Sequence, residues 1–286
     1  MAIKRVLTPQ DQQRFRELLQ ASSIAALMDS RRWEPGDLAF KGGTCLHLAH
    51  GSARFSEDLD FMVRGGLSLD GLSKEVQRRL QMLPGVPLDM RVTVSSARDE
   101  RNPHAFMVTL GGSNVIGTAK VKIELWQTPA AALKSLQVVV KAIPSATGAQ
   151  AFVPTLTLRE MLSDKVYALG ARERLKARDV FDLWWLCDKQ PMALEPEGLT
   201  VRLDIYPGKD ETRAQTAARW ISMAQARLVS MQTSKATLAV TEDLIRWLPS
   251  SWKMDQAVAA DMMAVAVQKL EQGLQIMCRL FPTQRR

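Results

Sequence analysis

The sequence contains few cysteines, few aromatic residues and no long apolar run. Cys45, Cys187 and Cys278 stand far apart among 286 residues, so they form neither a disulfide framework nor a spaced zinc site. We interpret them as buried thiols of a protein from a reducing compartment. Apolar runs stay shorter than the roughly 18 residues that span a bilayer, and the first residues lack a signal-peptide core. These absences predict a cytoplasmic protein with no membrane partner.

Positive charge is in excess. The chain carries 38 Lys and Arg against 30 Asp and Glu, which gives a formal net charge of +8. This excess favours anionic partners such as nucleic acids and nucleotides, although charge alone specifies no function. A hydrophobic share of 46% is typical of a globular protein and excludes disorder as the dominant state.

The first half of the chain has the pattern of a sheet. Runs rich in Val, Ile, Met or Thr, separated by Gly, Pro, Asn or Ser, predict a series of strands. The predicted strands are residues 37–41, 58–63, 89–95, 105–110, 118–126 and 137–143. A helix capped by Thr8 precedes them, and a short helix over 44–50 separates the first two.

The second half has the pattern of helices. After a turn at 144–148, a helix is predicted from Thr157, and no further strand series is evident. More helices are predicted over 211–233, 239–248 and 254–280, with a long loop over 190–209. We therefore predict an α+β protein, with an α/β region over residues 1–150 and a mainly helical region over 151–286.

The stretch from Lys41 to Phe61 is the most informative. On a predicted strand, Asp58 and Asp60 share one face, so two carboxylates converge. Such a pair repels itself unless a cation or a shared proton intervenes. Hard oxygen ligands of this kind suit Mg²⁺, which recruits substrate phosphates to complete its coordination. An Asp-x-Asp alone is common on solvated edges, so its neighbours decide the interpretation.

A glycine pair lies upstream of these carboxylates. Gly42 and Gly43 let the backbone approach a ligand closely, and free amides at the start of a helix attract phosphate. This glycine pair, followed by the hydroxyl residue Thr44 and then by Asp58 on a strand, resembles the first motif of the DNA polymerase β-like nucleotidyltransferases. The resemblance implies a mixed sheet with flanking helices, followed by a helical C-terminal region. It also implies a third carboxylate on a later strand.

Glu124 is our candidate for that third carboxylate. Val121, Ile123 and Leu125 alternate inward on the strand over 118–126, which leaves Glu124 on the polar face. We predict that it is a third metal ligand and that it accepts the proton of an acceptor hydroxyl. The alternative is an exposed strand carboxylate paired with a lysine.

A second informative stretch runs from 160 to 183. Lys165 and Arg172 lie two turns apart on a predicted helix, so both can reach one polyphosphate. Asp179 and Asp182 share a face in the same way. The cluster Arg172, Arg174, Lys176 and Arg178 is denser than an ordinary solvated face, which favours contact with RNA or nucleotide phosphates.

Together these motifs resemble the AbiEii/AbiGii (MenT-type) nucleotidyltransferase toxin family. The shared features are a Gly-Gly-Thr helix, an Asp-Leu-Asp strand, a Lys-x-x-Ala-Leu-x-x-Arg helix and a Lys-x-Arg-Asp-x-x-Asp run. The resemblance makes Asp58 and Asp60 the Mg²⁺ ligands, and Lys165 the residue that grips the nucleotide phosphates. It places Asp179 in the active site with Arg178 and Asp182 beside it. Ser56 would lie at the phosphate site with the Gly43-Thr44 turn, as a place for regulatory modification.

The resemblance also implies a function. It indicates a magnesium-dependent toxin of a toxin–antitoxin or phage-defence system, with a cognate antitoxin protein as partner. Such an enzyme transfers NMP from an NTP to RNA, in particular to the 3′ end of tRNA, and so blocks translation. Two alternatives stay open: a nucleotidyltransferase acting on a small molecule such as an antibiotic, and a catalytically silent module that binds RNA or a partner.

Two further features have simpler explanations. His47 and His50 could face one metal, but no carboxylate completes a zinc set nearby. Trp184 and Trp185 could stack on a base. Adjacent helix positions point apart, so at least one of these tryptophans is expected in the core.

Overall fold

The computed structural model describes residues 4–96, 103–145, 148–189 and 192–282. The chain forms two compact units. The α/β unit comprises residues 1–51, 56–134 and 138–155, and the helical unit comprises residues 52–55, 135–137 and 156–286. Two short segments of the first half of the chain therefore belong to the second unit.

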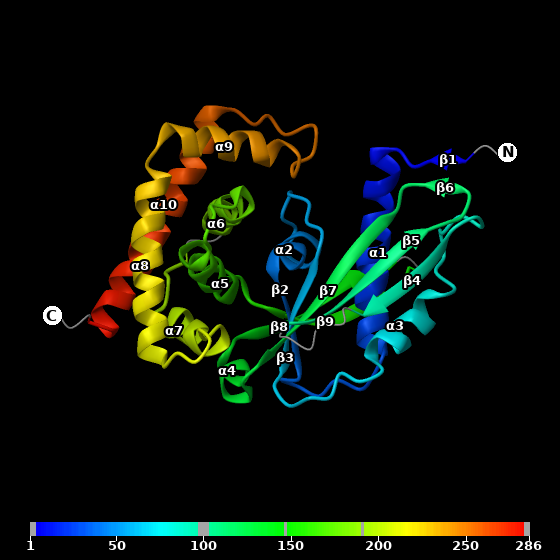
Figure 1. Ribbon diagram of the computed structural model, residues 1–286, viewed down its shortest axis with the longest axis horizontal. Helices are drawn as coiled ribbons and strands as arrows, with labels where there is room; N and C mark the ends of the chain where they lie inside the picture. The colour runs from blue at the N-terminus through cyan, green and yellow to red at the C-terminus, as the bar shows by residue number, and fades with distance from the viewer. Residues whose placement is uncertain (1–3, 97–102, 146–147, 190–191, 283–286) are drawn as a thin grey trace. The chain divides into compact units, whose positions relative to one another are not determined.

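A seven-stranded mixed sheet forms the centre of the α/β unit, in the order β4-β5-β7-β3-β2-β9-β8 (Figure 1). Its strands are β2 (Leu38–Lys41), β3 (Leu59–Arg64), β4 (Arg91–Ser96), β5 (His104–Gly111), β7 (Ala119–Thr128), β8 (Val138–Pro144) and β9 (Gln150–Leu156). A small parallel pair, β1 (Arg5–Val6) and β6 (Val115–Ile116), forms a separate sheet. The predicted α+β fold is confirmed.

Alternation along β7 positions the core. Val121, Ile123 and Leu125 are at most 1% exposed, as their spacing predicts. Helix α1 (Pro9–Asp29) packs along β7 and β5. It begins with a capping box in which Thr8 and Asp11 satisfy each other's backbone amides. On the neighbouring strands, Phe40 and Phe61 stack with ring centroids 4.7 Å apart.

Shorter helices complete the α/β unit. They are α2 (Gly42–His50), α3 (Leu72–Leu80) and α4 (Ala130–Ser135), of which only α2 is predicted from the sequence. Strand β9 is also unexpected, since the sequence after residue 148 predicts only helices. Its buried positions Ala151, Val153 and Thr155 alternate, but this short pattern follows Pro and Gly residues that indicate a turn.

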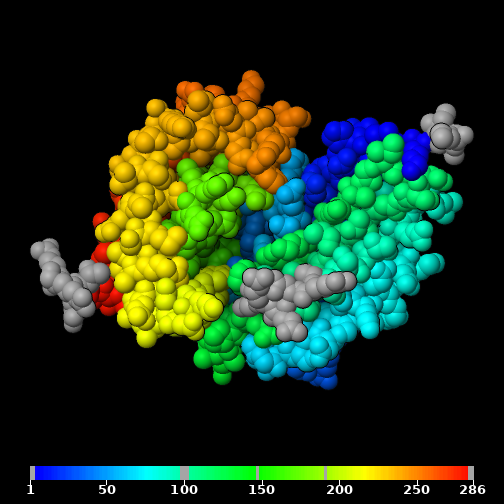
Figure 2. All heavy atoms as spheres, in the orientation of Figure 1, coloured from blue at the N-terminus to red at the C-terminus, as the bar shows by residue number. Residues whose placement is uncertain are grey.

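The helical unit has α5 at its centre. Its helices are α5 (Leu158–Ala171), α6 (Ala177–Lys189), α7 (Pro196–Ile205), α8 (Arg213–Met231), α9 (Ser234–Ile245) and α10 (Gln256–Leu280). Helix α5 contacts α6, α7, α8 and α10. Gly170 allows this packing, because a Cβ there would come 2.6 Å from the ring of Trp220. In the space-filling view, α8 and α9 form a continuous outer surface of this unit (Figure 2).

The predicted loop over 190–209 is wrong for part of its length, because α7 occupies Pro196–Ile205. Pro196 stands at the first turn of this helix, where its missing N–H costs nothing. Leu199 and Leu203 are at most 1% exposed, so packing stabilises a segment whose prolines suggest a loop.

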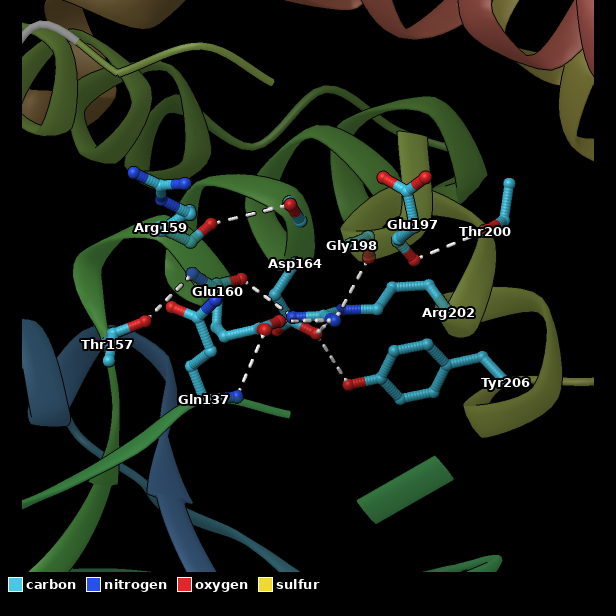
Figure 3. Close-up of polar contacts among 11 residues, drawn as sticks. Gln137, Thr157, Arg159, Glu160, Asp164, Glu197, Gly198, Thr200, Arg202 and Tyr206 are labelled. Carbon is cyan, nitrogen blue, oxygen red and sulfur yellow. Dashed lines mark hydrogen bonds and ion pairs between the residues drawn. The ribbon is translucent and has the colours of Figure 1, made fainter. Parts of the chain in front are cut away.

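A buried ionic cluster joins α5 to α7 (Figure 3). Arg202, fully buried, donates to the Oε2 of Glu160 at 2.8 Å and to the backbone oxygen of the same residue at 2.7 Å. The hydroxyl of Tyr206 donates to Asp164 Oδ1 at 2.9 Å. The Oε1 of Glu160 accepts from the backbone amide of Gln137 at 3.1 Å. These bonds fix the rotation of α5 about its own axis.

The structure tests the prediction that all three cysteines are buried thiols. All three cysteines are free thiols, but only Cys45 is buried, while Cys187 is half-buried and Cys278 exposed. Their interpretation as three buried thiols is therefore wrong for Cys278, which lies on the exposed face of α10.

Within the described ranges, no helix combines the length and apolarity needed to cross a membrane.

Candidate functional site

The glycine turn and the acidic strand are in direct contact in the α/β unit. Gly42 follows β2 directly and begins α2 with a φ of +80°, a conformation that L side chains rarely adopt. A Cβ at this position would come 2.5 Å from Asp60 Oδ2. The absence of a side chain at Gly42 therefore leaves the space that the carboxylate of Asp60 uses.

Asp60 and Glu124 are paired across two parallel strands. Asp60 on β3 is the register partner of Glu124 on β7, and of Lys41 on β2. Register partners on neighbouring strands point to the same face of the sheet. Asp58 lies just before β3, two residues from Asp60, and both aspartates are half-buried. The structure thus brings the three predicted carboxylates to one end of the β3–β7 pair.

Lys122 lies among these carboxylates. Its ammonium group forms an ion pair and hydrogen bond with the Oε1 of Glu124 on the same strand. The hydrogen bond that Lys122 donates to Glu124 raises the pKa of Lys122, and the charges of Asp58 and Asp60 act in the same direction. The alternative expected for Glu124, a strand carboxylate paired with a lysine, therefore describes the contact in the structure.

The donor set suits a hard cation, because carboxylate oxygens are the ligands that Mg²⁺ prefers. In the described part of the chain, however, no three His, Cys, Asp or Glu side chains are arranged as a ready ligand set. Glu124 faces Lys122 instead. The residues thus have the chemistry for a divalent cation, with Glu124 held by an ammonium group.

Thr44 contacts the acidic strand, and Ser56 lies two residues before Asp58 in the sequence. Thr44 is fully buried, and its hydroxyl donates to the backbone oxygen of Asp58, which ties the start of α2 to the acidic strand. Ser56 is 9% exposed, and its backbone oxygen accepts from Gln20 Nε2 at 2.7 Å. Gly43 is buried in the first turn of α2. Gly42, Gly43 and Thr44 thus form the first turn of α2, whereas the contact of Ser56 is with Gln20 of α1.

A second charged cluster lies within the helical unit. The Nζ of Lys165 is 2.7 Å from Asp182 Oδ2 and 3.0 Å from Asp179 Oδ1. Burial disfavours the ammonium group, but the charges of Asp182 and Asp179 outweigh it and raise the pKa of Lys165. The predicted face shared by Asp179 and Asp182 thus receives Lys165 from the neighbouring helix α5.

Arg54 completes this cluster from a segment that precedes β3 in sequence. Its Nε and Nη2 donate to the two oxygens of Asp182, each at 2.6 Å, and both side chains are at most 2% exposed. Burial would raise the pKa of Asp182, but Arg54 and Lys165 lower it to about 2. Asp182 is therefore ionised and doubly paired.

Two more arginines adjoin Asp179. Arg172 Nη1 lies 2.9 Å from Asp179 Oδ2, and the charge of Asp179 also acts on Arg227. Arg227 Nη2 donates to the backbone oxygen of Arg172 at 2.6 Å. Among the described residues of this cluster, basic side chains outnumber carboxylates. Lys165 and Arg54 are already paired with aspartates, whereas the Arg172 side chain is 44% exposed, so a further anion such as a phosphate can reach Arg172.

Sequence reasoning missed Arg54 and Arg227. The local pattern around Arg54 identifies a basic residue near the acidic strand, but its partner Asp182 is 128 positions away. Arg227 resembles any polar position on an amphipathic helix. No local signal distinguishes such buried arginines from solvated ones.

Arg178 lies outside these ion pairs. Its guanidinium group lies over the ring of Trp247, 4.2 Å from the centroid. Arg174 and Lys176 are exposed. Trp185 is 4% exposed, which confirms that one of the adjacent tryptophans belongs to the core.

The chain matches known proteins by family and by fold. Residues 26–247 match the family model described as nucleotidyl transferase AbiEii toxin, type IV TA system. JHP933 from Helicobacter pylori is similar in structure, with a TM-score of 0.52 and 18% identity over 98% of this chain and 100% of that one. MenT4, a nucleotidyltransferase toxin from Mycobacterium tuberculosis H37Rv, has a TM-score of 0.54 and 15% identity over 92% of this chain and 84% of that one. No curated protein matches by sequence.

Proposed function

We propose, because the chain belongs to the AbiEii nucleotidyl transferase toxin family of type IV toxin–antitoxin systems, that it transfers NMP from an NTP to a hydroxyl of RNA and releases pyrophosphate. The acceptor that we propose is the 3′ end of tRNA, whose modification prevents aminoacylation and blocks translation. The observation that carries this proposal is the pairing of Asp60 with Glu124, with Gly42 against Asp60.

The acidic site has the groups that nucleotidyl transfer needs. Asp58 and Asp60 would hold Mg²⁺, with Glu124 as the third ligand once it leaves Lys122. When bound, the metal neutralises charge on the phosphates and lowers the pKa of the acceptor hydroxyl. Glu124 would then accept the hydroxyl proton. The amides of Gly43 and Thr44, with Ser56 beside them, would contact the phosphates.

The cluster in the helical unit supplies positive charge for the triphosphate. Lys165 and Arg172 would contact the phosphate oxygens, and Asp179 would keep Lys165 charged and oriented. Arg178, which precedes Asp179 on α6, would add a further positive charge. The excess of basic side chains around Asp179 supports this role.

The partners follow from the family and from the charge. A chain with a net charge of +8 attracts a polyanion such as tRNA. A cognate antitoxin protein would neutralise the enzyme in the cell. Phage defence is the biological setting that we propose for this pair.

Incorporation of each labelled NTP into total RNA with Mg²⁺ tests the proposal. Asp58→Ala and Asp60→Ala should lower incorporation at least about a hundredfold, since even residues that only orient metal ligands contribute about that much. Asp70→Ala removes an exposed carboxylate from the same unit and should leave incorporation unchanged. If either acidic-site variant retained turnover, the assignment of Asp58 and Asp60 as metal ligands would be wrong.

The acceptor is tested in the same assay. Label in a tRNA-sized band that disappears in Asp58→Ala supports the RNA acceptor. Label on a member of an aminoglycoside panel instead would favour a small-molecule acceptor. A folded protein that retains RNA, binds no NTP and behaves identically as Asp58→Ala would be a silent binding module.

A further inference from the structure

Lys122 and Glu124 are two residues apart on β7, so their side chains share one face of the sheet. The ammonium group of Lys122 contacts Glu124 directly. The charges of Asp58 and Asp60, on and beside the neighbouring strand, also act on it. One positive group thus contacts Glu124 directly and lies close enough to Asp58 and Asp60 for their charges to act on it.

The contact between Lys122 and Glu124 is accessible to solvent. The Lys122 side chain is 40% exposed and that of Glu124 is 17% exposed. Ion pairs at such positions contribute little to stability, because water and salt compete with them. Lys122 can therefore leave Glu124 without disturbing the fold, whereas a buried pair such as Arg54 and Asp182 cannot.

We propose that Lys122 is the built-in counter-cation of the acidic site and competes with a divalent cation for Glu124. The proposal rests on the proposed function, because it uses the same three carboxylates. The ammonium group occupies Glu124 Oε1 and repels a second cation, so a divalent ion that binds Glu124 has to displace it. Lys122 thereby sets the cation concentration at which the site fills.

Titration of the whole chain with Mn²⁺ alone tests this inference. Binding is measured by calorimetry, or by the electron paramagnetic resonance signal of free Mn²⁺. Lys122→Met should bind Mn²⁺ about five- to tenfold more tightly, as expected for removing one charge a few ångströms away in a partly exposed site. Lys120→Met is the matched control. It removes the same charge from the same face of β7, two residues farther from Glu124, and should change the affinity less than about twofold.

A double substitution isolates the contact. In a Glu124→Gln background, Lys122→Met should affect Mn²⁺ affinity no more than Lys120→Met does, because the competed carboxylate is gone. The same affinity in Lys122→Met and Lys120→Met would overturn the inference. Unchanged Mn²⁺ affinity with weaker NTP binding in Lys122→Met would also overturn it, and would assign this lysine to the nucleotide.

Failure of the proposed metal site has a different signature. Asp60→Asn should weaken Mn²⁺ binding strongly if the site is where we place it. Mn²⁺ binding that Asp60→Asn leaves intact, or no binding in any variant, would overturn both the metal assignment and the role of Lys122. In a third outcome, the wild type binds Mn²⁺, Asp60→Asn abolishes this binding and Lys122→Met does not change it. That result would overturn the role of Lys122 and keep the metal assignment.

Discussion

At the scale of single residues, the acidic site depends on what Gly42 lacks. The backbone at Gly42 has a positive φ, and the space of a missing Cβ is used by Asp60 Oδ2. Two separate penalties therefore oppose any side chain at this position: backbone strain and a clash with a carboxylate. Few residues of the chain combine both.

Gly42→Ala should consequently abolish nucleotide incorporation and weaken Mn²⁺ binding, because the new methyl group displaces Asp60. Gly36→Ala is the matched control, since Gly36 has a φ of +84° with nothing within 4 Å of a Cβ. Both variants should lose about 1–2 kcal/mol of stability from backbone strain, measured by urea unfolding. Equal activity in the two variants would contradict the importance of the contact with Asp60.

At the scale of elements, α5 is held by charges on two sides. On one side, Glu160 pairs with Arg202 of α7, and Asp164 accepts a hydrogen bond from Tyr206 at the end of that helix. On the other side, Lys165 pairs with Asp179 and Asp182 of α6. Because adjacent helix residues point about 100° apart, these contacts lock both the rotation and the register of α5. Lys165 therefore has a defined direction.

Arg202→Met tests this arrangement. Loss of the guanidinium group leaves Glu160 buried without its partner, so the free energy of unfolding should fall by about 3–5 kcal/mol. Arg213→Met removes an exposed arginine of α8 that pairs with Asp204 of α7, and should change stability by less than about 1 kcal/mol. Comparable unfolding midpoints in urea for the two variants would contradict the clamp on α5.

At the scale of the whole molecule, the chain passes between its units more than once. Residues 52–55 connect α2 to β3 but belong to the helical unit, where Arg54 pairs with Asp182 and the amide of Phe55 donates to the backbone oxygen of Trp247 at 2.7 Å. The segment that connects the glycine turn of α2 to the acidic strand β3 therefore makes its contacts in the helical unit.

This anchor predicts a pH dependence of stability. The pKa of Asp182 is about 2 in the folded chain against an ordinary 3.8. The ionised carboxylate therefore stabilises the fold above about pH 4, on the order of 2 kcal/mol, and that contribution disappears as the pH falls through about 2. Arg54→Met should raise the pKa of Asp182 and lower stability at neutral pH by about 3–5 kcal/mol.

Urea unfolding of the Arg54→Met variant between pH 3 and pH 7 checks this prediction. The stability deficit of Arg54→Met relative to the wild type should be largest near neutral pH and should shrink toward pH 3, where the uncompensated carboxylate becomes protonated. Arg246→Met, which removes an exposed arginine paired with Asp243, should parallel the wild type at every pH. A deficit that does not vary with pH would mean that Arg54 acts through packing alone.

The sequence by itself determined the features that depend on neighbouring residues. Period-two alternation identified β7 and its polar face, so the third carboxylate that the resemblance implies could be assigned to Glu124 before its register with Asp60 was known. The glycine pair and the Asp-Leu-Asp run identified the end of β2, the start of α2 and the acidic strand. The resemblance that these motifs carry gave the family, which the match over residues 26–247 confirms.

Only the tertiary structure decided the features that depend on distant residues. Packing against α5 makes a helix of the proline-containing α7 segment, and pairing with β2 makes a strand of β9. Arg54 finds Asp182 only when the chain is folded, and Asp60 lies opposite Glu124 only when β3 and β7 lie in register. Local patterns record which face of an element is apolar, but the partner of a charge is set by contacts across the whole sequence.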